Sequence, residues 1–574
     1  MKSSRRVLSV LALLLLLALA FSGCTGAGDG ASTVFEGADE AAAPSGEEND
    51  INQVERHRLQ EGGTLLWPLE GMPPNFNRHA VDGALGYTVA VMGALLLSPF
   101  DFDAAGRPIE NEDLVESAEL TTTEPQQVVT YRINPEAVWY DGTPITVADF
   151  EAQWRALRGT DTAFKVASTQ GYDTIESVTA GNNDREVVVT FREDYADWRG
   201  LFSGLYPAST NRDPAVFNEG WREKTLTTAG PFRFENLDRT AQTITLVRNE
   251  RWWGDPAKLD RIVYRVLSQD DAEIDALANG EIHFLDVGPD VNKLKRAQTT
   301  PGIELRRAAG PNYRQITLNG SSEVLGDVQV RRALALAIDR DIIVRALLGP
   351  LDIPAETLDN HIFMRNQRGY QDNSDELGAH DPERAEAILD EAGWQRAGAV
   401  RAKDGRELAL RFVIPSQFAP SKQEAELVQS MLQRIGVRVN IEAVPSEDFV
   451  QYLIAGDFDL TVFSWYGTPF PISSSRSVYT QPLPDDRGDS NVSQNYARVG
   501  SAEIDRMFDQ AIGEFDEAKA IDLANQIDAL IWQVVHSLPL YQRPEIVATR
   551  ADLANFGAFG FSNREYEDVG FIAS

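Results

Sequence analysis

Strand and helix patterns alternate along residues 408–465, and this alternation constrains the fold more than any other feature of the sequence. Residues 408–414 alternate apolar and other side chains with the two-residue period of a strand, and the same period returns at 437–441. Residues 421–435 repeat apolar side chains on one helical face, and a second helical stretch covers 446–457. A third strand pattern, FDLTVFSW, follows directly. This order of strands and helices predicts an α/β lobe.

Cap residues predict where these helices begin and end. Ser421 and Glu424 have the spacing of a capping box, in which two side chains satisfy free backbone N–H groups of the first turn. Gly436 stands where the end of that helix needs a residue with left-handed backbone. Upstream, Asp381 followed by Pro382 predicts the start of another helix.

The first half of the chain is richer in strand patterns. We expect strands over 62–71, 128–133 and 185–194, and a hairpin that joins PFRFEN to TITLV across a polar turn. Thr146, with Asp149 three residues later, is an acidic variant of the capping box and predicts a helix start. The length of 574 residues is too great for one compact core and suggests about three or four domain-sized units.

The N-terminus has the composition of a secretory signal peptide. A short basic region precedes an apolar run over residues 7–21, and Ser22, Gly23 and Cys24 follow. The apolar run is short for a membrane span, which needs roughly 20 residues. The pattern resembles the bacterial lipobox, in which the cysteine becomes the lipid-carrying N-terminus, although Phe21 departs from the usual leucine. We therefore expect a signal peptide over 1–24 with lipid on Cys24; the alternative is a plain signal peptide with an incidental cysteine.

Residues 25–61 are expected to form a disordered tether. They are rich in Gly, Ala, Ser, Glu and Asp and contain few residues that build a core. A flexible run of this length spans on the order of 30–36 Å root-mean-square. Each buried methylene of a lipid chain adds about 0.8 kcal/mol of membrane affinity, and the diacylglycerol of a lipobox cysteine meets the need for two chains. The folded body would then lie outside the membrane, attached only through its N-terminal lipid.

Composition excludes several classes of function. The formal net charge of −34 disfavours nucleic acid as a partner, and no basic patch with interleaved aromatic residues offsets it. A single cysteine forms no internal disulfide, and the six histidines have no spacing typical of a metal site. The sequence contains no GxSxG, HExxH, Walker or GxGxxG motif. We expect no metal, no cofactor and no enzymatic activity.

Several segments together resemble the extracytoplasmic solute-binding proteins of ABC importers, family 5, whose members take up dipeptides, oligopeptides and nickel. The similar segments occur in the order found in the family and extend over about residues 62–545. They are 139–150, 228–266, 275–287, 312–322, 327–344, 381–394 and 456–467.

The resemblance implies an α/β, three-lobed fold of the type II periplasmic-binding-protein kind, with a ligand cleft between two lobes. Lobe I would combine 62–93, 228–318 and 535–574, lobe II would be an insertion over 94–227, and lobe III would cover 319–534. Lobes I and III would close on the ligand as a hinged trap and exclude water from its polar contacts.

The resemblance also implies ligand-binding residues at the end of the last strand of lobe III. In peptide-binding members, an acidic residue of a Trp-x-x-Asp pattern pairs with the free amine of the peptide. Here Trp465 matches the tryptophan and Thr468 stands where the aspartate would be, and no carboxylate occurs over 463–483. Losing one side of a buried charge pair costs about 2–5 kcal/mol of binding. We therefore expect a ligand other than an ordinary short peptide, or one not held by its amine, unless a carboxylate comes from another loop.

Other residues are expected near the same ligand. The aromatic residues Tyr466 and Phe470 could stack on it, with Gly467 between them in the same loop. A first loop of lobe I is expected to face the cleft, although it could be a solvated turn, and Asn319 could contact ligand or support the hinge. The residues of that first loop are Asn75, Phe76 and Asn77.

Three functions remain open from the sequence. The first is a monomeric, lipid-anchored receptor that delivers a peptide or peptide-like solute to ABC permease subunits. The second is a lipoprotein of the same fold that regulates cell-envelope glycolipid synthesis, an alternative kept open by the altered loop at Thr468. The third is a secreted hydrolase, which the absence of hydrolase motifs disfavours.

Overall fold

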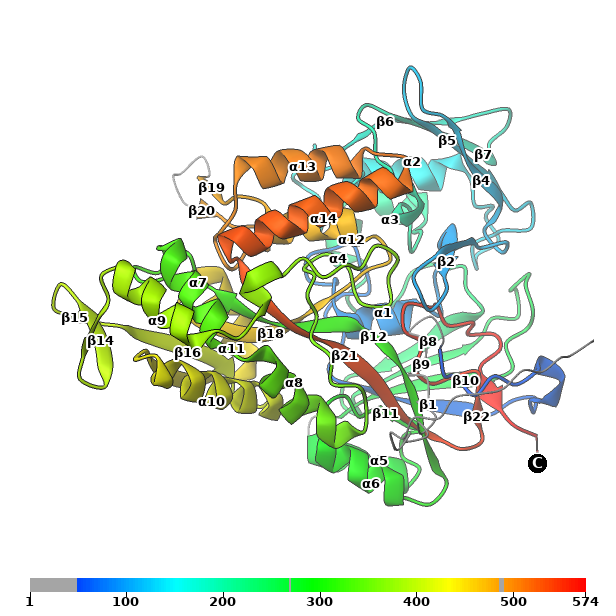
Figure 1. The fold of residues 1–574 in the computed structure, drawn as a ribbon. Helices are drawn as coiled ribbons and strands as arrows, with labels where there is room; N and C mark the ends of the chain where they lie inside the picture. Colours follow the sequence, from blue (N-terminus) through cyan, green and yellow to red (C-terminus); the bar gives the residue numbers. More distant parts are fainter. Residues whose placement is uncertain (1–48, 268–269, 485–489, 574) are drawn as a thin grey trace, which may run out of the picture. The chain divides into compact units, whose positions relative to one another are not determined.

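The computed structural model describes residues 49–267, 270–484 and 490–573 (Figure 1). The expected signal peptide, Cys24 and most of the expected tether lie outside the described residues. The end of that tether differs from the prediction, because residues 49–61 pack on the C-terminal segment. The backbone N–H of Asp50 donates to the carbonyl of Ala558 (2.9 Å), and Arg56 pairs with Asp568. Residues 50–61 therefore belong to the folded body rather than to a disordered tether.

One four-stranded sheet lies in the range predicted for lobe I. Its order is β1 (Thr64–Leu69), β10 (Arg261–Val266), β9 (Thr243–Arg248) and β8 (Phe232–Asp238). Strands β8 and β9 pair antiparallel, which confirms the predicted hairpin. Strand β1 pairs parallel to β10, nearly 200 residues away in sequence, and buries Leu65, Trp67 and Leu69.

A second four-stranded sheet lies in the range predicted for lobe II. Its strands are β4 (Val115–Thr122), β5 (Val128–Ile133), β7 (Glu186–Phe191) and β6 (Ile175–Ala180), all antiparallel. Helix α2 (Val147–Leu157) has the predicted capping box: the hydroxyl of Thr146 accepts from Ala148, and Asp149 accepts from the backbone N–H of Thr146 (2.8 Å). The predicted strands and helix start in this region are confirmed.

A six-stranded sheet runs through the ranges predicted for lobes I and III. Two long strands, β12 (Ile303–Leu318) and β21 (Ser537–Arg550), are neighbours in it and pair antiparallel. Strand β18 (Leu460–Tyr466) follows β12, and β16 (Ala409–Pro415) and β17 (Arg438–Val444) complete the order β11-β21-β12-β18-β16-β17. The pairs β16–β17 and β16–β18 are parallel.

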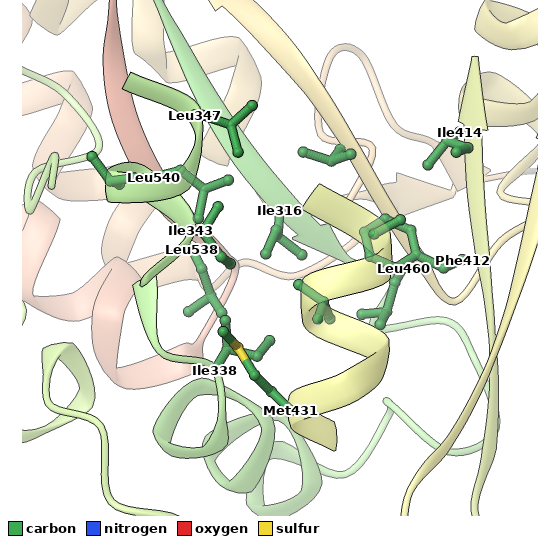
Figure 2. Close-up of a cluster of buried hydrophobic side chains, with 14 of the residues drawn as sticks. Ile316, Ile338, Ile343, Leu347, Phe412, Ile414, Met431, Leu460, Leu538 and Leu540 are labelled. Carbon is green, nitrogen blue, oxygen red and sulfur yellow. The ribbon is translucent and has the colours of Figure 1, made fainter. Parts of the chain in front are cut away.

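The core against this sheet is aliphatic. Figure 2 shows Ile316 of β12, Phe412 of β16 and Leu538 of β21 directed into one cluster with side chains of the covering helices. Those helices include α7 (Val328–Ala337), α8 (Arg340–Leu348), α9 (Pro382–Glu391) and α10 (Ala419–Arg434), whereas α11 (Ser446–Ala455) packs against Val413 of β16 in a separate cluster. Sheet and helices together confirm the predicted α/β fold.

Two of the caps predicted for α9 and α10 are confirmed, and one is wrong. Asp381 caps α9, with Pro382 as its first residue, and Gly436 follows α10 with the expected positive φ of 81°. Helix α10, however, begins at Ala419 after Phe418, so the capping box predicted at Ser421 is wrong. Ser421 and Glu424 lie inside the helix because both bind the buried guanidinium of Arg314 on β12.

Three further helices precede the long strand β21 in the sequence. They are α12 (Pro471–Tyr479), α13 (Ala502–Ile512) and α14 (Glu517–Val534), and Figure 1 shows the last two side by side. Of the helices in the described ranges, none combines the length and apolar character of a membrane span. The remaining elements are α1 (Gly86–Met92), β2 (Phe100–Phe102), β3 (Pro108–Glu110), α3 (Ala208–Asn211), α4 (Pro214–Glu219), α5 (Asp270–Ala278), β11 (Phe284–Asp286), α6 (Val291–Thr299), β13 (Gln395–Ala397), β14 (Val400–Lys403), β15 (Arg406–Glu407), β19 (Leu483–Pro484), β20 (Ser490–Asn491), β22 (Leu553–Ala554), β23 (Gly570–Phe571) and the short 3-10 turns η1 (Arg56–Arg58), η2 (Trp198–Gly200), η3 (Gly349–Leu351) and η4 (Asp375–Gly378).

Candidate functional site

A cavity of about 1040 Å³ lies at the end of β18. One wall comes from the predicted lobe III and consists of residues 465–468, α12 and residues near 493. The opposite wall comes from residues 166–174 and 193–195 of the predicted lobe II, and Tyr313 of β12 lies between them. The resemblance implied closure of lobes I and III, whereas this cavity is enclosed mainly by the ranges assigned to lobes II and III.

Trp465 forms part of this wall, as predicted. Its ring stacks on Tyr496 with centroids 5.7 Å apart and planes at 6°, and Phe463 meets it edge-on at 5.2 Å. Its indole N–H is buried without a hydrogen-bond partner, a costly state for a donor in a protein interior. The stack on Tyr496 fixes the ring in the cavity wall.

Tyr466 and Gly467 continue the wall. Tyr466 is 76% exposed, although Glu70, Asp286 and Arg543 are near enough to act on its hydroxyl. Its largely exposed side chain lines the cavity. The backbone N–H of Gly467 donates to the carbonyl of Pro311 (2.6 Å), and a Cβ at this position would lie 2.9 Å from that oxygen. The close approach requires glycine here.

Thr468 lines the cavity but uses its side chain to hold its own loop. Its hydroxyl donates to Oγ of Ser474 (3.0 Å) and accepts from the backbone N–H of Phe470 (3.1 Å). Phe470 is not part of the cavity wall; its ring packs edge-on against Phe102 of the predicted lobe II, with centroids 5.5 Å apart. The prediction that Phe470 stacks on ligand does not fit this arrangement.

The first-loop residues are also not in a position to contact ligand. Asn75, Phe76 and Asn77 are all 0% exposed. The Asn75 amide donates to Asp82 and to the carbonyl of Asn218, and the Asn77 amide donates to the carbonyl of Phe217. They were predicted to face the cleft, but they are buried because their side chains satisfy the backbone of neighbouring loops.

Asn319 is likewise structural. It is 1% exposed, and its amide donates to the carbonyls of Gly456 (3.0 Å) and Phe458 (2.8 Å). Its carbonyl oxygen accepts from Ser321. The residue fixes the crossover after β12, which matches the hinge-supporting alternative rather than ligand contact.

The sequence did not reveal the carboxylates that line the cavity. Asp173, Glu193 and Asp194 come from the predicted lobe II, and Asp509 comes from α13. The guanidinium of Arg476 pairs with Asp509 (2.7 Å), which leaves the cavity with an excess of acidic groups. Burial raises the pKa of Asp173 and Asp194, and neighbouring carboxylates add to the rise. Carboxylates thus come from other loops, which was the condition left open for amine recognition.

Aromatic and serine residues that line or support the cavity were also missed. Tyr313 and Tyr195 line it, and Tyr496 supports it through Trp465. The serine-rich turn of α12, SSSRS, lies along the cavity wall. A serine-rich helix beside the Trp465 loop was the one signal in the sequence that could have indicated this wall.

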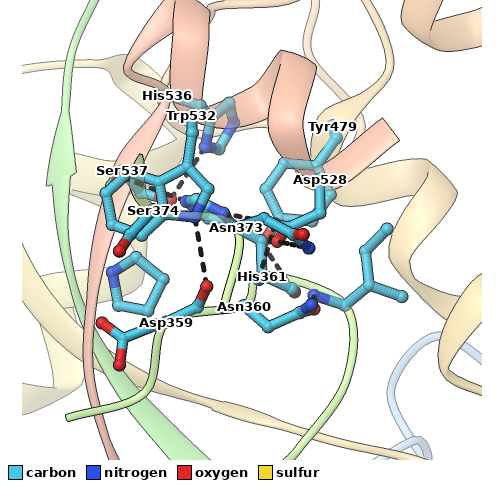
Figure 3. A network of polar contacts seen from close by, with 12 residues as sticks. Asp359, Asn360, His361, Asn373, Ser374, Tyr479, Asp528, Trp532, His536 and Ser537 are labelled. Atoms are coloured by element: carbon cyan, nitrogen blue, oxygen red, sulfur yellow. Dashed lines mark hydrogen bonds and ion pairs between the residues drawn. The ribbon is translucent and has the colours of Figure 1, made fainter. Parts of the chain in front are cut away.

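Behind α12 lies a buried polar network (Figure 3). Asp528 accepts from the backbone N–H of His361 (2.8 Å) and contacts its Nδ1 (2.7 Å), and both side chains are 0% exposed. Nε2 of His361 faces the backbone carbonyl of Ser537 (3.1 Å), whereas the hydroxyl of Ser537 faces His536. This geometry is not a Ser-His-Asp triad and has no access for substrate. The hydroxyl of Tyr479, on α12, donates to the carbonyl of His361 (3.1 Å), which fixes the helix that lines the cavity.

Metal binding finds no support in the residues described. Among them, no group of three or more His, Cys, Asp and Glu side chains has a geometry suited to a metal ion. The cavity offers instead aromatic rings, hydroxyls and carboxylates, groups that recognise an organic solute by stacking, hydrogen bonding and charge.

Comparison with known proteins places this arrangement in a family. The family model of bacterial extracellular solute-binding proteins, family 5, middle region, matches residues 111–484. The oligopeptide-binding protein OppA of Mycobacterium tuberculosis is 42% identical over 565 residues, which cover 97% of this chain and 93% of OppA. The probable monoacyl phosphatidylinositol tetramannoside-binding protein LpqW of the same species is 30% identical over 292 residues, which cover 49% of this chain and 44% of LpqW.

A solved structure agrees. The periplasmic EDTA-binding protein EppA superimposes with a TM-score of 0.83 at 25% identity, covering 93% of this chain and 100% of that chain. The resemblance and the fold class expected from the sequence are thereby confirmed, and members of the family are binding proteins rather than enzymes. The chain belongs to the bacterial extracellular solute-binding proteins of family 5, the extracytoplasmic receptors of ABC importers.

Proposed function

We propose that this receptor captures short peptides in the cavity beside Trp465 and delivers them to ABC permease subunits. The observation that carries the proposal is the cavity of about 1040 Å³, which is large enough for several residues and is lined by aromatic and hydroxyl groups. The similarity to OppA over nearly the whole chain supports a peptide as the solute.

The free amine of the peptide pairs with the carboxylates of the predicted lobe II rather than with residue 468. Asp173, Glu193 and Asp194 line the cavity, and among the described residues of its wall the one basic side chain, Arg476, pairs with Asp509. Glu193 adds to the raised pKa of Asp173, so the unliganded site holds mutually repelling charges. An ammonium group would relieve this repulsion. These carboxylates are exposed, so each contributes modestly, about fivefold in affinity.

Isothermal titration calorimetry tests this proposal with one pentapeptide in two forms, with a free and an N-acetylated amine. We expect acetylation to weaken binding, and Asp194→Asn to weaken binding of the free amine while leaving the acetylated peptide unchanged. Affinity should also fall as the pH drops through the raised pKa of Asp173 and Asp194, because protonation removes the charge that attracts the amine. Equal affinity for both peptide forms would refute amine recognition, and no binding of either would refute the peptide proposal.

Attachment to the membrane through lipid on Cys24 completes the proposed receptor. The apolar run and small residues before the only cysteine support it. Cys24→Ser should release the protein from the membrane fraction and abolish incorporation of labelled fatty acid. A variant that stays in the membrane fraction would contradict lipid anchoring.

A regulatory role in glycolipid synthesis is the second candidate, favoured by the similarity of half of the chain to LpqW. Peptide uptake by cells that lack the gene distinguishes the two. Loss of uptake supports the receptor, whereas normal uptake with altered envelope glycolipids supports regulation.

A further inference from the structure

The cavity wall of the predicted lobe III rests on a short segment of the predicted lobe II. That segment covers residues 196–200 and ends in the turn η2. The ring of Phe470 lies against Gly200, where a Cβ would come within 2.9 Å of its Cε2 atom and 3.0 Å of its Cδ2 atom. Phe102 packs on the same ring. Phe470 therefore occupies a fitted recess that only a glycine at 200 leaves open.

The same segment meets the start of α12. The N-cap residue of that helix, Phe470, provides no side-chain cap, so the first turn depends on other groups. Burial raises the pKa of Asp197, at the start of η2, and the nearby hydroxyl and backbone N–H of Ser473 act against the rise. A carboxylate of the predicted lobe II thus lies beside the first turn of α12.

A third contact fixes the segment to α13. The backbone N–H of Ala196 donates to the carbonyl of Ile512 (2.8 Å), at the end of that helix. Within this segment, Ala196 contacts α13, Asp197 lies near the start of α12, and Gly200 lies against the ring of Phe470.

Displacement of Phe470 would be transmitted directly to the cavity. Its backbone N–H donates to the hydroxyl of Thr468, and that hydroxyl donates in turn to Ser474. Both Thr468 and Ser474 line the cavity. The contacts from Gly200 to the cavity pass through only two residues, Phe470 and Thr468.

We propose that residues 196–200 position the ligand-binding wall, and that Phe470 and Gly200 are positioning residues for ligand binding rather than ligand contacts. The inference deepens the proposed function and rests on it for its ligand. Under this proposal, the predicted lobe II contributes to binding in two ways: its own residues line the cavity, and its segment 196–200 positions the opposite wall.

Gly200→Ala tests the inference with a minimal change. Gly200 lies outside the left-handed region, so alanine fits the backbone and only the contact with Phe470 changes. Gly349→Ala is the matched control, because a Cβ there meets nothing within 4 Å. Overpacking of this kind corresponds to roughly tenfold weaker binding of the free-amine pentapeptide. The control should bind as the wild type does.

Hydrogen exchange of the free protein supplies a second readout that needs no ligand. In Gly200→Ala, the amides of Gly467 and Phe470 should exchange faster than in the wild type, and amides of β5 should not change. The double variant Gly200→Ala/Phe470→Leu returns space to the recess and should restore both affinity and protection.

The outcomes separate the two proposals. Unchanged affinity and unchanged exchange in Gly200→Ala would overturn the positioning role. If the wild type binds no pentapeptide but the amides of Gly200→Ala still exchange faster, the positioning role is supported and the proposed ligand is refuted. If Gly200→Ala does not fold, Phe102→Leu loosens the recess without adding volume and should weaken binding at least threefold; wild-type affinity in that variant would overturn the inference.

Discussion

The buried pair of Arg314 and Glu424 gives the sharpest test of how this fold is held together. Arg314 lies at the centre of β12 and Glu424 on α10, with side chains 3% and 0% exposed. Nε of Arg314 donates to Glu424 (3.1 Å), a second guanidinium N–H donates to the other carboxylate oxygen, and the hydroxyl of Tyr541 also donates to Glu424 (3.2 Å). Burial alone would lower the pKa of Arg314, and the Glu424 carboxylate more than reverses this.

Glu424→Leu removes the anion and leaves the guanidinium buried. Arg314 would retain only the hydroxyl of Ser421 (3.0 Å) and the ring of Phe418, whose centroid lies 5.1 Å away. Breaking a buried pair in this way costs about 3–5 kcal/mol, because an uncompensated charge remains in a low-dielectric interior. The double variant Arg314→Met/Glu424→Leu replaces both charges with apolar groups and should recover most of the loss.

Equilibrium urea unfolding, followed by circular dichroism, measures these differences as a double-mutant cycle with Arg314→Met as the fourth protein. We expect Glu424→Leu to lower the free energy of unfolding by about 3–5 kcal/mol and the double variant to lie within about 1 kcal/mol of the wild type. A Glu424→Leu protein within 1 kcal/mol of the wild type, or losses that simply add in the double variant, would refute the pairing as described.

Three further predictions follow from individual contacts. Thr146→Ala should lower the free energy of unfolding by about 1 kcal/mol, because α2 loses its N-cap; thermal unfolding checks this, and no change would mean that Asp149 alone suffices. Trp465→Leu should weaken binding of the free-amine pentapeptide about tenfold in calorimetry, since the stacked ring is lost, and wild-type affinity would exclude the ring from the site. His361→Leu should destabilise the protein by about 1–3 kcal/mol in urea unfolding, because the buried Asp528 loses its contact with Nδ1 of His361, and an unchanged free energy of unfolding would contradict that contact.

Local rules predicted the elements of this fold well wherever local chemistry decides the outcome. Alternating apolar residues gave β16 and β17, and Asp381 and Thr146 cap the helices they were expected to cap. The failure at Ser421 has a tertiary cause. Ser421 and Glu424 have the spacing of a capping box, but inside the helix both side chains bind Arg314, which lies more than 100 residues earlier in the sequence. The residues around the helix alone cannot predict this long-range contact.

The candidate site could be predicted only in part for a similar reason. Trp465, Tyr466, Gly467 and Thr468 belong to one continuous segment, and similarity to the family located it on the cavity wall. The opposite wall comes from loops near residues 170 and 194, almost 300 residues earlier, with no motif of their own. Asn75 and its neighbours were assigned to the cleft by position in the family, but their amides satisfy buried backbone groups in this chain.

The replacement of an aspartate by Thr468 is consistent with the charges on the opposite wall. The hydroxyl of Thr468 donates a hydrogen bond to Ser474 and accepts one from the backbone N–H of Phe470. An ionised carboxylate at position 468 could accept hydrogen bonds but could not donate one. It would also add a like charge to a cavity that already contains Asp173, Glu193 and Asp194. Asp173, Glu193 and Asp194 supply carboxylates to one wall, and Trp465 and Tyr466 supply rings to the opposite wall, so an amine-bearing peptide would be recognised only where both walls are in place. In the proposed receptor, charge recognition and closure of the cavity would therefore be one event, and the segment proposed at 196–200 would be one contact through which either wall affects the other.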